Sequence, residues 1–545
     1  MIAKNSTRNS LVGLTVVLAL SGPWSPHAGA QTAPRLDPRS SASSAVISSH
    51  PRSSASSAVI SGASRPPAVA DPMAGFDAYV AKAVKEWEVP GLAIAVVKDD
   101  SVTFIHGYGV RTLGANDPVD EHTTFAIGST TKAFTSYEVM LLADSGKLSL
   151  ESRVADRYPA FQIQPAFASQ ELTVRDLLTH RSGIPSTDYL WYDTRLDFDQ
   201  MAVKMRLAKP SYSFRTHFQY QNVTYALAGY IAARAAGTDW ETLTRTRILD
   251  PLGMRETFTA TDAAEAHGDI ASAHFRVDDT IRVIQRYHTD NIAPAGSIYS
   301  SVADMSRWMR FLLDSARLAG KRTIPAPLFE ELWRVQMPVG ADEFYPTARL
   351  THPHYTAYGL GWFLEDYRGE QVVFHTGSID GMVAIVGLIP DRKLGVVVLA
   401  NLDHAEVRHA LMYTVFDRYL GGGTHDWSAE MNQMYSGFRR QRAQAEAEVV
   451  RKRVAGTRPS LPLAQYAGTY ADPLYGSITV KLVNGKLAVT DELDAGALDH
   501  WNYDTFVFVH AKRWLGKDLV TFTLGPDGRV TGLTPGEGIV YARQP

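Results

Sequence analysis

Ser129 and Lys132 are the residues of this chain whose types and spacing point most directly to catalysis. They stand three positions apart where helical periodicity begins, so a helix that opens at Ser129 places both side chains on one face. The partial positive charge of a helix N-terminus and burial both lower the pKa of a lysine in the first turn. A neutral amine beside a hydroxyl can accept its proton, so this pair predicts a serine nucleophile activated by a lysine base.

Two later groups complete the pattern: Tyr220 with Asn222, and the run His375-Thr376-Gly377. Tyr220 is expected to be the second proton carrier of the site, after Lys132. Its phenol works as a base only if Lys132 and the local electric field stabilise the phenolate or relay the proton. Each group alone has an ordinary explanation, such as a helix cap, a solvated lysine or a turn former. Their ordered combination favours a serine acyl-transfer site.

With these groups the chain resembles the serine β-lactamase and penicillin-binding-protein superfamily, in the branch of class C β-lactamases, DD-peptidases, D-aminopeptidases and related esterases. The resemblance covers about residues 72–420, and it includes the stretches 89–97, 177–185 and 294–301. It implies an α+β fold, with an antiparallel sheet flanked by helices and a helical lobe. Strands expected at both ends of this region, with helices between them, agree with that fold.

The resemblance also assigns roles to the site residues. Ser129 attacks a carbonyl and forms an acyl-enzyme, while the backbone amides of Ser129 and Ser378 hold the oxyanion. Four residues are expected to bind substrate: Asn222, His375, Thr376 and Gly377. Gly377 leaves room for the substrate backbone at the strand edge. Class C lactamases carry a lysine where this chain has His375, which either binds a substrate carboxylate or only shapes the pocket.

The expected function is therefore that of a serine hydrolase acting on amide or ester carbonyls, a peptidase or amidase of the DD-peptidase or D-aminopeptidase kind on small peptides. A carboxylesterase or a β-lactamase of the same fold is an alternative. So is a non-catalytic peptidoglycan-binding or sensor protein, because acylation without turnover needs the same residues. A serine-histidine-aspartate triad with His180 or His375 as base is disfavoured, since no G-x-S-x-G elbow appears. No cofactor and no metal ion is expected.

The first part of the chain predicts export. Residues 1–30 combine Lys4 and Arg8, an apolar run over 11–20 and a small-residue cleavage site at 28–30, which is typical of a signal peptide. No later stretch approaches the ~18 apolar residues of a membrane span. The chain has no cysteine, so none can be lipid-modified at the export junction, and the mature protein is expected in the periplasm or the medium.

Charge and composition limit the kinds of partner that this protein can bind and indicate how its domains are organised. A net charge of −3 gives no basic field for nucleic acid, so a small molecule or short peptide is the expected partner. Residues 31–71 form a Ser/Ala-rich linker, in which the sequence of 38–48 recurs as 51–61 and cannot bury enough apolar surface to fold.

Beyond the hydrolase region, residues 421–460 are expected to form a charged linker helix. Residues 461–545 read as a small β-sheet or barrel domain, because Asn484-Gly485 and Asp527-Gly528 are strong hairpin signals. This last part resembles the β-rich modules appended to members of the same hydrolase family.

Overall fold

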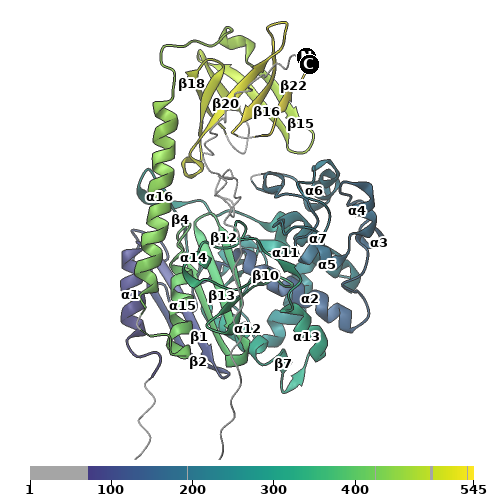
Figure 1. Ribbon diagram of the computed structural model, residues 1–545, viewed down its shortest axis with the longest axis vertical. Helices are drawn as coiled ribbons and strands as arrows, with labels where there is room; N and C mark the ends of the chain where they lie inside the picture. Colours follow the sequence, from purple (N-terminus) through teal and green to yellow (C-terminus); the bar gives the residue numbers. More distant parts are fainter. Residues whose placement is uncertain (1–70, 193, 424, 491–494, 537) are drawn as a thin grey trace, which may run out of the picture.

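The computed structural model describes residues 71–545, apart from 193, 424, 491–494 and 537. The predicted signal peptide lies outside the described residues, as does the predicted linker except for Asp71. Within these ranges no helix has the length and apolar character needed to cross a membrane. Figure 1 shows a body of sheet and helices, one long helix and a barrel.

The body contains the expected antiparallel sheet, which has eight strands in the order β2-β1-β14-β13-β12-β11-β10-β9. The strands are β1 (Gly91–Lys98), β2 (Ser101–Gly109), β9 (Met337–Pro338), β10 (Thr356–Tyr358), β11 (Phe363–Tyr367), β12 (Glu370–Ile379), β13 (Met382–Ile389) and β14 (Leu394–Ala400). Strand β1 pairs with β14, so segments from the two ends of this region lie side by side in one sheet. This confirms the α+β fold.

Helices cover both faces of the sheet, which explains why β13 and β14 are buried throughout. One face packs against α15 (Val407–Leu420), where Met412 and Phe416 surround Gly387 of β13. The other face packs against α12 (Val302–Leu313), where Met309 and Leu313 surround Gly395 of β14. Helix α1 (Phe76–Glu86) lies with α15, and the long α16 (Trp427–Arg451) packs on α15 and leads toward the barrel (Figure 1).

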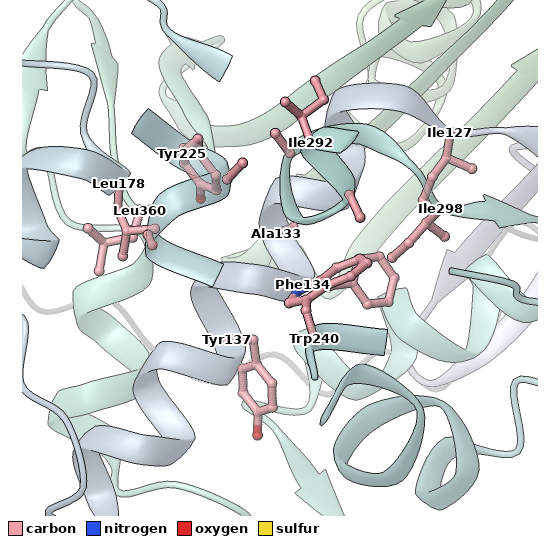
Figure 2. Close-up of a cluster of buried hydrophobic side chains, with 14 of the residues drawn as sticks. Ile127, Ala133, Phe134, Tyr137, Leu178, Tyr225, Trp240, Ile292, Ile298 and Leu360 are labelled. Atoms are coloured by element: carbon pink, nitrogen blue, oxygen red, sulfur yellow. The ribbon is translucent and has the colours of Figure 1, made fainter. Parts of the chain in front are cut away.

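The helical lobe is built around α2 (Lys132–Asp144) and α7 (Asn222–Ala236). Helix α2 is buried on most of its circumference, as is typical of a central helix. Figure 2 shows Ala133, Phe134 and Tyr137 of α2 among side chains from distant segments, including Tyr225 and Trp240. The shorter helices are α3 (Val154–Arg157), α4 (Ala166–Glu171), α5 (Val174–Leu178), α6 (Phe198–Lys204), α8 (Trp240–Thr244), α9 (Asp250–Leu252), α10 (Thr261–His267), α11 (Ala293–Gly296), α13 (Ala326–Leu332) and α14 (Ala348–Thr351).

Three small antiparallel pairs join loops of the body: β3 (Phe125–Ala126) with β6 (Tyr299–Ser300), β4 (Ala273–Val277) with β5 (Thr280–Ile284), and β7 (Arg317–Leu318) with β8 (Lys321–Arg322). The first pair matters most for function, because it lies directly before the turn that carries Ser129.

The C-terminal part is a closed all-β barrel with eight strands: β15 (Gly468–Asp472), β16 (Gly476–Val483), β17 (Lys486–Thr490), β18 (Ala495–Asn502), β19 (Thr505–His510), β20 (Lys517–Leu524), β21 (Val530–Pro535) and β22 (Tyr541–Arg543). Strand β15 pairs with β16 and with β22, which closes the barrel. Tyr466, Phe506 and Phe522 fill its interior, with ring centroids 5.1 to 5.5 Å apart. At the β16–β17 turn, Asn484 and Gly485 have φ values of 50° and 77°, as a type I′ hairpin turn requires.

Candidate active site

Ser129 lies in a 3-10 turn (Gly128–Thr131) that runs directly into α2 at Lys132. The sequence predicted that Ser129 would open an α-helix, but the α-helix begins three residues later. In a 3-10 turn, residues i and i+3 eclipse each other, so the two side chains meet more directly than on an α-helix. The Lys132 Nζ lies 2.9 Å from the Ser129 Oγ. A backbone hydrogen bond of 2.9 Å from Ile127 to the Ile298 carbonyl fixes the turn from the side of β3 and β6.

Lys132 is completely buried and has three hydrogen-bond partners. Besides Ser129, these are the Asn222 side-chain oxygen at 2.8 Å and the Ala295 carbonyl at 2.9 Å. Burial lowers the pKa of Lys132 well below its usual range, while the Asp188 carboxylate acts in the opposite direction. The direction of this pKa shift agrees with the sequence prediction, and of the two predicted causes burial is the one that dominates. In its neutral form, the amine can donate one N–H group to the Asn222 oxygen and one to the Ala295 carbonyl. Its lone pair is then available to accept the Ser129 proton.

Tyr220 presents a buried hydroxyl that has no hydrogen bond within the described part of the chain. Its ring centroid lies 4.8 Å from the Lys132 Nζ. Burial raises the pKa of Tyr220 well above its usual range, and the nearby Ser129 hydroxyl offsets only part of this. The phenol therefore stays protonated at neutral pH, so it can donate a proton but is poorly suited to accept one.

His180 holds the segment that carries Tyr220. Its carbonyl accepts a hydrogen bond of 2.7 Å from the Gln219 amide, and its Nδ1 accepts one of 3.0 Å from the Gln221 amide. The two rings of His180 and Tyr220 pack with centroids 4.3 Å apart. The sequence had offered His180 as a rival catalytic base. This geometry makes it a positioning residue, and no carboxylate in the described ranges pairs with it.

His375 is 1% exposed, and burial lowers its pKa to about 3. Its Nε2 lies 3.0 Å from the Tyr358 hydroxyl and its Nδ1 lies 2.6 Å from the Thr376 carbonyl. A neutral imidazole carries no charge for a substrate carboxylate, so this environment supports the expectation that His375 shapes the pocket. Thr376 points to the other face of β12, because strand side chains alternate, and its hydroxyl lies 2.6 Å from that of Tyr345.

Gly377 and Gly128 allow β12 to pack against the turn that carries Ser129. A Cβ on Gly377 would lie 1.8 Å from the Ile127 carbonyl oxygen, and one on Gly128, whose φ is +49°, would lie 2.7 Å from the Ser378 nitrogen. The glycine at 377 is thus required by packing of the chain on itself, whereas the sequence analysis assigned it to substrate approach. This contact brings the Ser378 backbone amide to the Ser129 turn.

Two site residues had no sequence signal. Asp188, in a short 3-10 turn (Asp188–Leu190), accepts hydrogen bonds of 3.2 Å from the Asn222 amide and 2.6 Å from the Trp191 indole. Arg408, at the start of α15, donates to the Gly377 carbonyl at 2.5 Å and to the Ser378 hydroxyl at 3.0 Å. Asp188 therefore orients the partner of Lys132, and Arg408 fixes the end of β12.

The expected site residues thus divide into two sets. The structure gathers Ser129, Lys132, Tyr220, Asn222, His375, Gly377 and the Ser378 amide around one point, and it turns the Thr376 side chain away. Across the described ranges, no group of three or more histidine, aspartate or glutamate side chains is placed to hold a metal ion.

Comparison with known proteins places this geometry in a family. The family model for Beta-lactamase matches residues 76–416, and a Domain of unknown function (DUF3471) matches residues 452–536. The chain is similar to the Unguisins hydrolase ungD of Aspergillus violaceofuscus, at 29% identity over 76% of this chain and 78% of that protein. It is also similar to Protein flp of Staphylococcus aureus, at 25% identity over 61% of this chain and 64% of that protein.

Among solved structures, the octameric penicillin-binding protein homologue from Pyrococcus abyssi shares the fold, with a TM-score of 0.56 and 22% identity. The match covers 87% of this chain and all of that one. Because the Beta-lactamase model matches well over half of the residues, this chain belongs to the β-lactamase family.

Proposed function

We propose that this protein is an exported serine hydrolase that cleaves amide or ester carbonyls through an acyl-enzyme on Ser129. The observation that carries the proposal is the buried Lys132, whose Nζ lies 2.9 Å from the Ser129 hydroxyl and whose pKa burial lowers well below its usual range. An ordinary alcohol becomes nucleophilic at neutral pH when such a base takes its proton. The predicted signal peptide supports export to the periplasm or the medium.

The residues support a complete proton path. As the Ser129 Oγ bonds to the substrate carbonyl carbon, its proton passes to Lys132, and the carbonyl oxygen becomes an oxyanion held by the Ser129 and Ser378 amides. When the bond to the leaving group breaks, the leaving atom takes a proton from the Tyr220 hydroxyl, which is replenished by Lys132. Water then attacks the acyl-enzyme, its proton moves to Lys132, and the proton returns to Ser129 as the acid product leaves.

The proposed substrates are small peptides or amides, as for a peptidase of the DD-peptidase or D-aminopeptidase kind. The neutral His375 supports this choice, because a lactam carboxylate would find no cation there. One relative is named as a hydrolase of unguisins, which agrees with hydrolysis but does not fix the substrate here. Carboxylesterase activity remains the alternative within the same site, since an ester presents the same carbonyl to the same serine.

The decisive experiment is intact-mass spectrometry of the mature protein after exposure to a panel of esters, D-peptides and penicillins. We expect a transient acyl adduct on Ser129 with the preferred substrate, and none in Ser129→Ala. Ser145→Ala, at the exposed end of α2, is the matched control and should acylate normally. An adduct that persists in Ser129→Ala would move the nucleophile elsewhere. A stable adduct with one equivalent of product and no turnover would indicate a sensor instead of an enzyme.

A further inference from the structure

The barrel touches the body at the loop that follows residue 186, close to the proposed catalytic lysine. The Tyr475 ring, in the turn between β15 and β16, meets the Tyr189 ring edge-to-face with centroids 5.8 Å apart. In the same turn, the carbonyls of Pro473 and Leu474 accept hydrogen bonds of 2.9 and 3.0 Å from the Lys204 Nζ. Tyr189 directly follows Asp188, whose carboxylate holds the Asn222 amide, so this contact lies next to the partners of Lys132.

The barrel also touches the body at the end of β12. Trp514, in a 3-10 turn (Arg513–Leu515), donates a hydrogen bond of 3.0 Å from its indole nitrogen to Asp380. Asp380 follows β12 directly and stands two residues after Ser378, whose backbone amide is a proposed oxyanion donor. It also accepts a hydrogen bond from the Tyr192 hydroxyl. Asp380 therefore connects β12, the loop after residue 186 and the barrel.

These contacts are part of the packed core. Leu474 is 9% exposed and belongs to the same buried apolar cluster as the interior of the helical lobe, and the Tyr475 and Trp514 rings pack against that cluster. Aromatic residues bury much apolar area and so hold their position well. A module that shares the core of its neighbour stays docked, whereas a small polar interface would let the domains move.

We propose that the two barrel segments 473–475 and 513–515 form a fixed roof over the substrate site, and that Tyr475 and Trp514 are specificity-determining residues. The inference rests on the proposed function. The roof meets the body at Tyr189, next to Asp188, and at Asp380, two residues after Ser378, so we expect it to limit the size of the acyl group that Ser129 can accept. It favours short acyl groups, whose apolar surface contacts the two aromatic rings. The interior of the barrel is filled, so the module acts through its rim.

The test compares acyl chain length in the full-length protein. The variants are Tyr475→Ala, Trp514→Ala and Trp514→Phe, which keeps a ring but removes the hydrogen bond to Asp380. Trp501→Ala is the control, because Trp501 lies in the barrel against Arg453, away from both contacts. The measurement is kcat/KM for p-nitrophenyl esters from acetyl to octanoyl, with thermal unfolding to verify the fold and fluorophosphonate labelling to verify Ser129.

We expect the alanine variants to raise the octanoyl-to-acetyl ratio of kcat/KM by about 10-fold or more, since removing a wall that rejects a few methylenes has effects of this size. Trp514→Phe should give an intermediate ratio, and Trp501→Ala should match the wild type. A ratio within twofold of the wild type in both alanine variants would overturn the inference. If the wild type neither labels at Ser129 nor hydrolyses any ester, the proposed function fails instead.

Discussion

Replacing Gly377 with alanine tests the oxyanion site without touching a reactive side chain. The added Cβ would lie 1.8 Å from the Ile127 carbonyl oxygen, closer than real Cβ contacts allow, so β12 must move away from the Ser129 turn by at least about 1 Å. Oxyanion donors act only at hydrogen-bond distance, and losing one costs about 100- to 1,000-fold in kcat. We therefore expect kcat of Gly377→Ala to fall by about that factor, with a much smaller change in KM.

The assay is steady-state hydrolysis of an activated ester, with two glycine-to-alanine controls. At Gly296, close to the site, an added Cβ has ordinary contact at 3.9 Å with Gly128. At Gly437, in α16, it also has ordinary contact, and alanine should stabilise the helix by about 0.5–1 kcal/mol. Both controls should keep the wild-type kcat. If folded Gly377→Ala, verified by thermal unfolding, stays within about threefold of the wild type, the Ser378 amide does not hold the oxyanion.

Four further outcomes follow from the site and the core. Lys132→Ala and Tyr220→Phe should each reduce acylation severely, with the double variant little worse than either, because the two groups form one relay; multiplicative losses would contradict this. Since burial lowers the pKa of Lys132 and raises that of Tyr220, kcat/KM should fall as the pH drops and the amine protonates, with a midpoint well below the usual pKa of a lysine. Because His375 is neutral, a cephalosporin should be a poorer substrate than a D-alanyl peptide by kcat/KM, and the opposite order would refute the inference. Burial raises the pKa of Glu365 to about 8, so between about pH 5 and 8 the folded state binds more protons than the unfolded state. The free energy of unfolding, measured with urea, should therefore decrease as the pH rises from about 5 to 8, and it should decrease less steeply in Glu365→Gln.

The sequence predicted those features that depend on neighbours along the chain. The serine and lysine share a turn, the strand signals around 91–109 and 372–399 are local, and the Asn484-Gly485 turn determines its own hairpin. The antiparallel sheet, the helical lobe and the C-terminal barrel followed from these signals together with the family resemblance. In each case the information lies within a few residues of the feature.

Features that arise between distant segments could not be predicted in this way. Asp188 and Arg408 look like any charged residue in a loop or at a helix start, and only the fold brings them to Asn222 and Gly377. The docking of Trp514 at Asp380 joins positions in two domains, and no periodicity encodes such a contact. Side-chain partners of this kind are set by tertiary packing.

Asp188 places a carboxylate close to Lys132, whose pKa burial lowers. Its charge raises the pKa of Lys132, which opposes the effect of burial. Yet an asparagine amide can present either its oxygen or its nitrogen, and the hydrogen bond from the Asn222 nitrogen to Asp188 leaves only the oxygen for Lys132. Without this carboxylate the Asn222 side chain could flip, and its NH2 group would then compete with the Ser129 hydroxyl for the lone pair of the Lys132 Nζ. Asp188 therefore holds the Asn222 oxygen toward the Lys132 amine, while burial lowers the pKa of that amine.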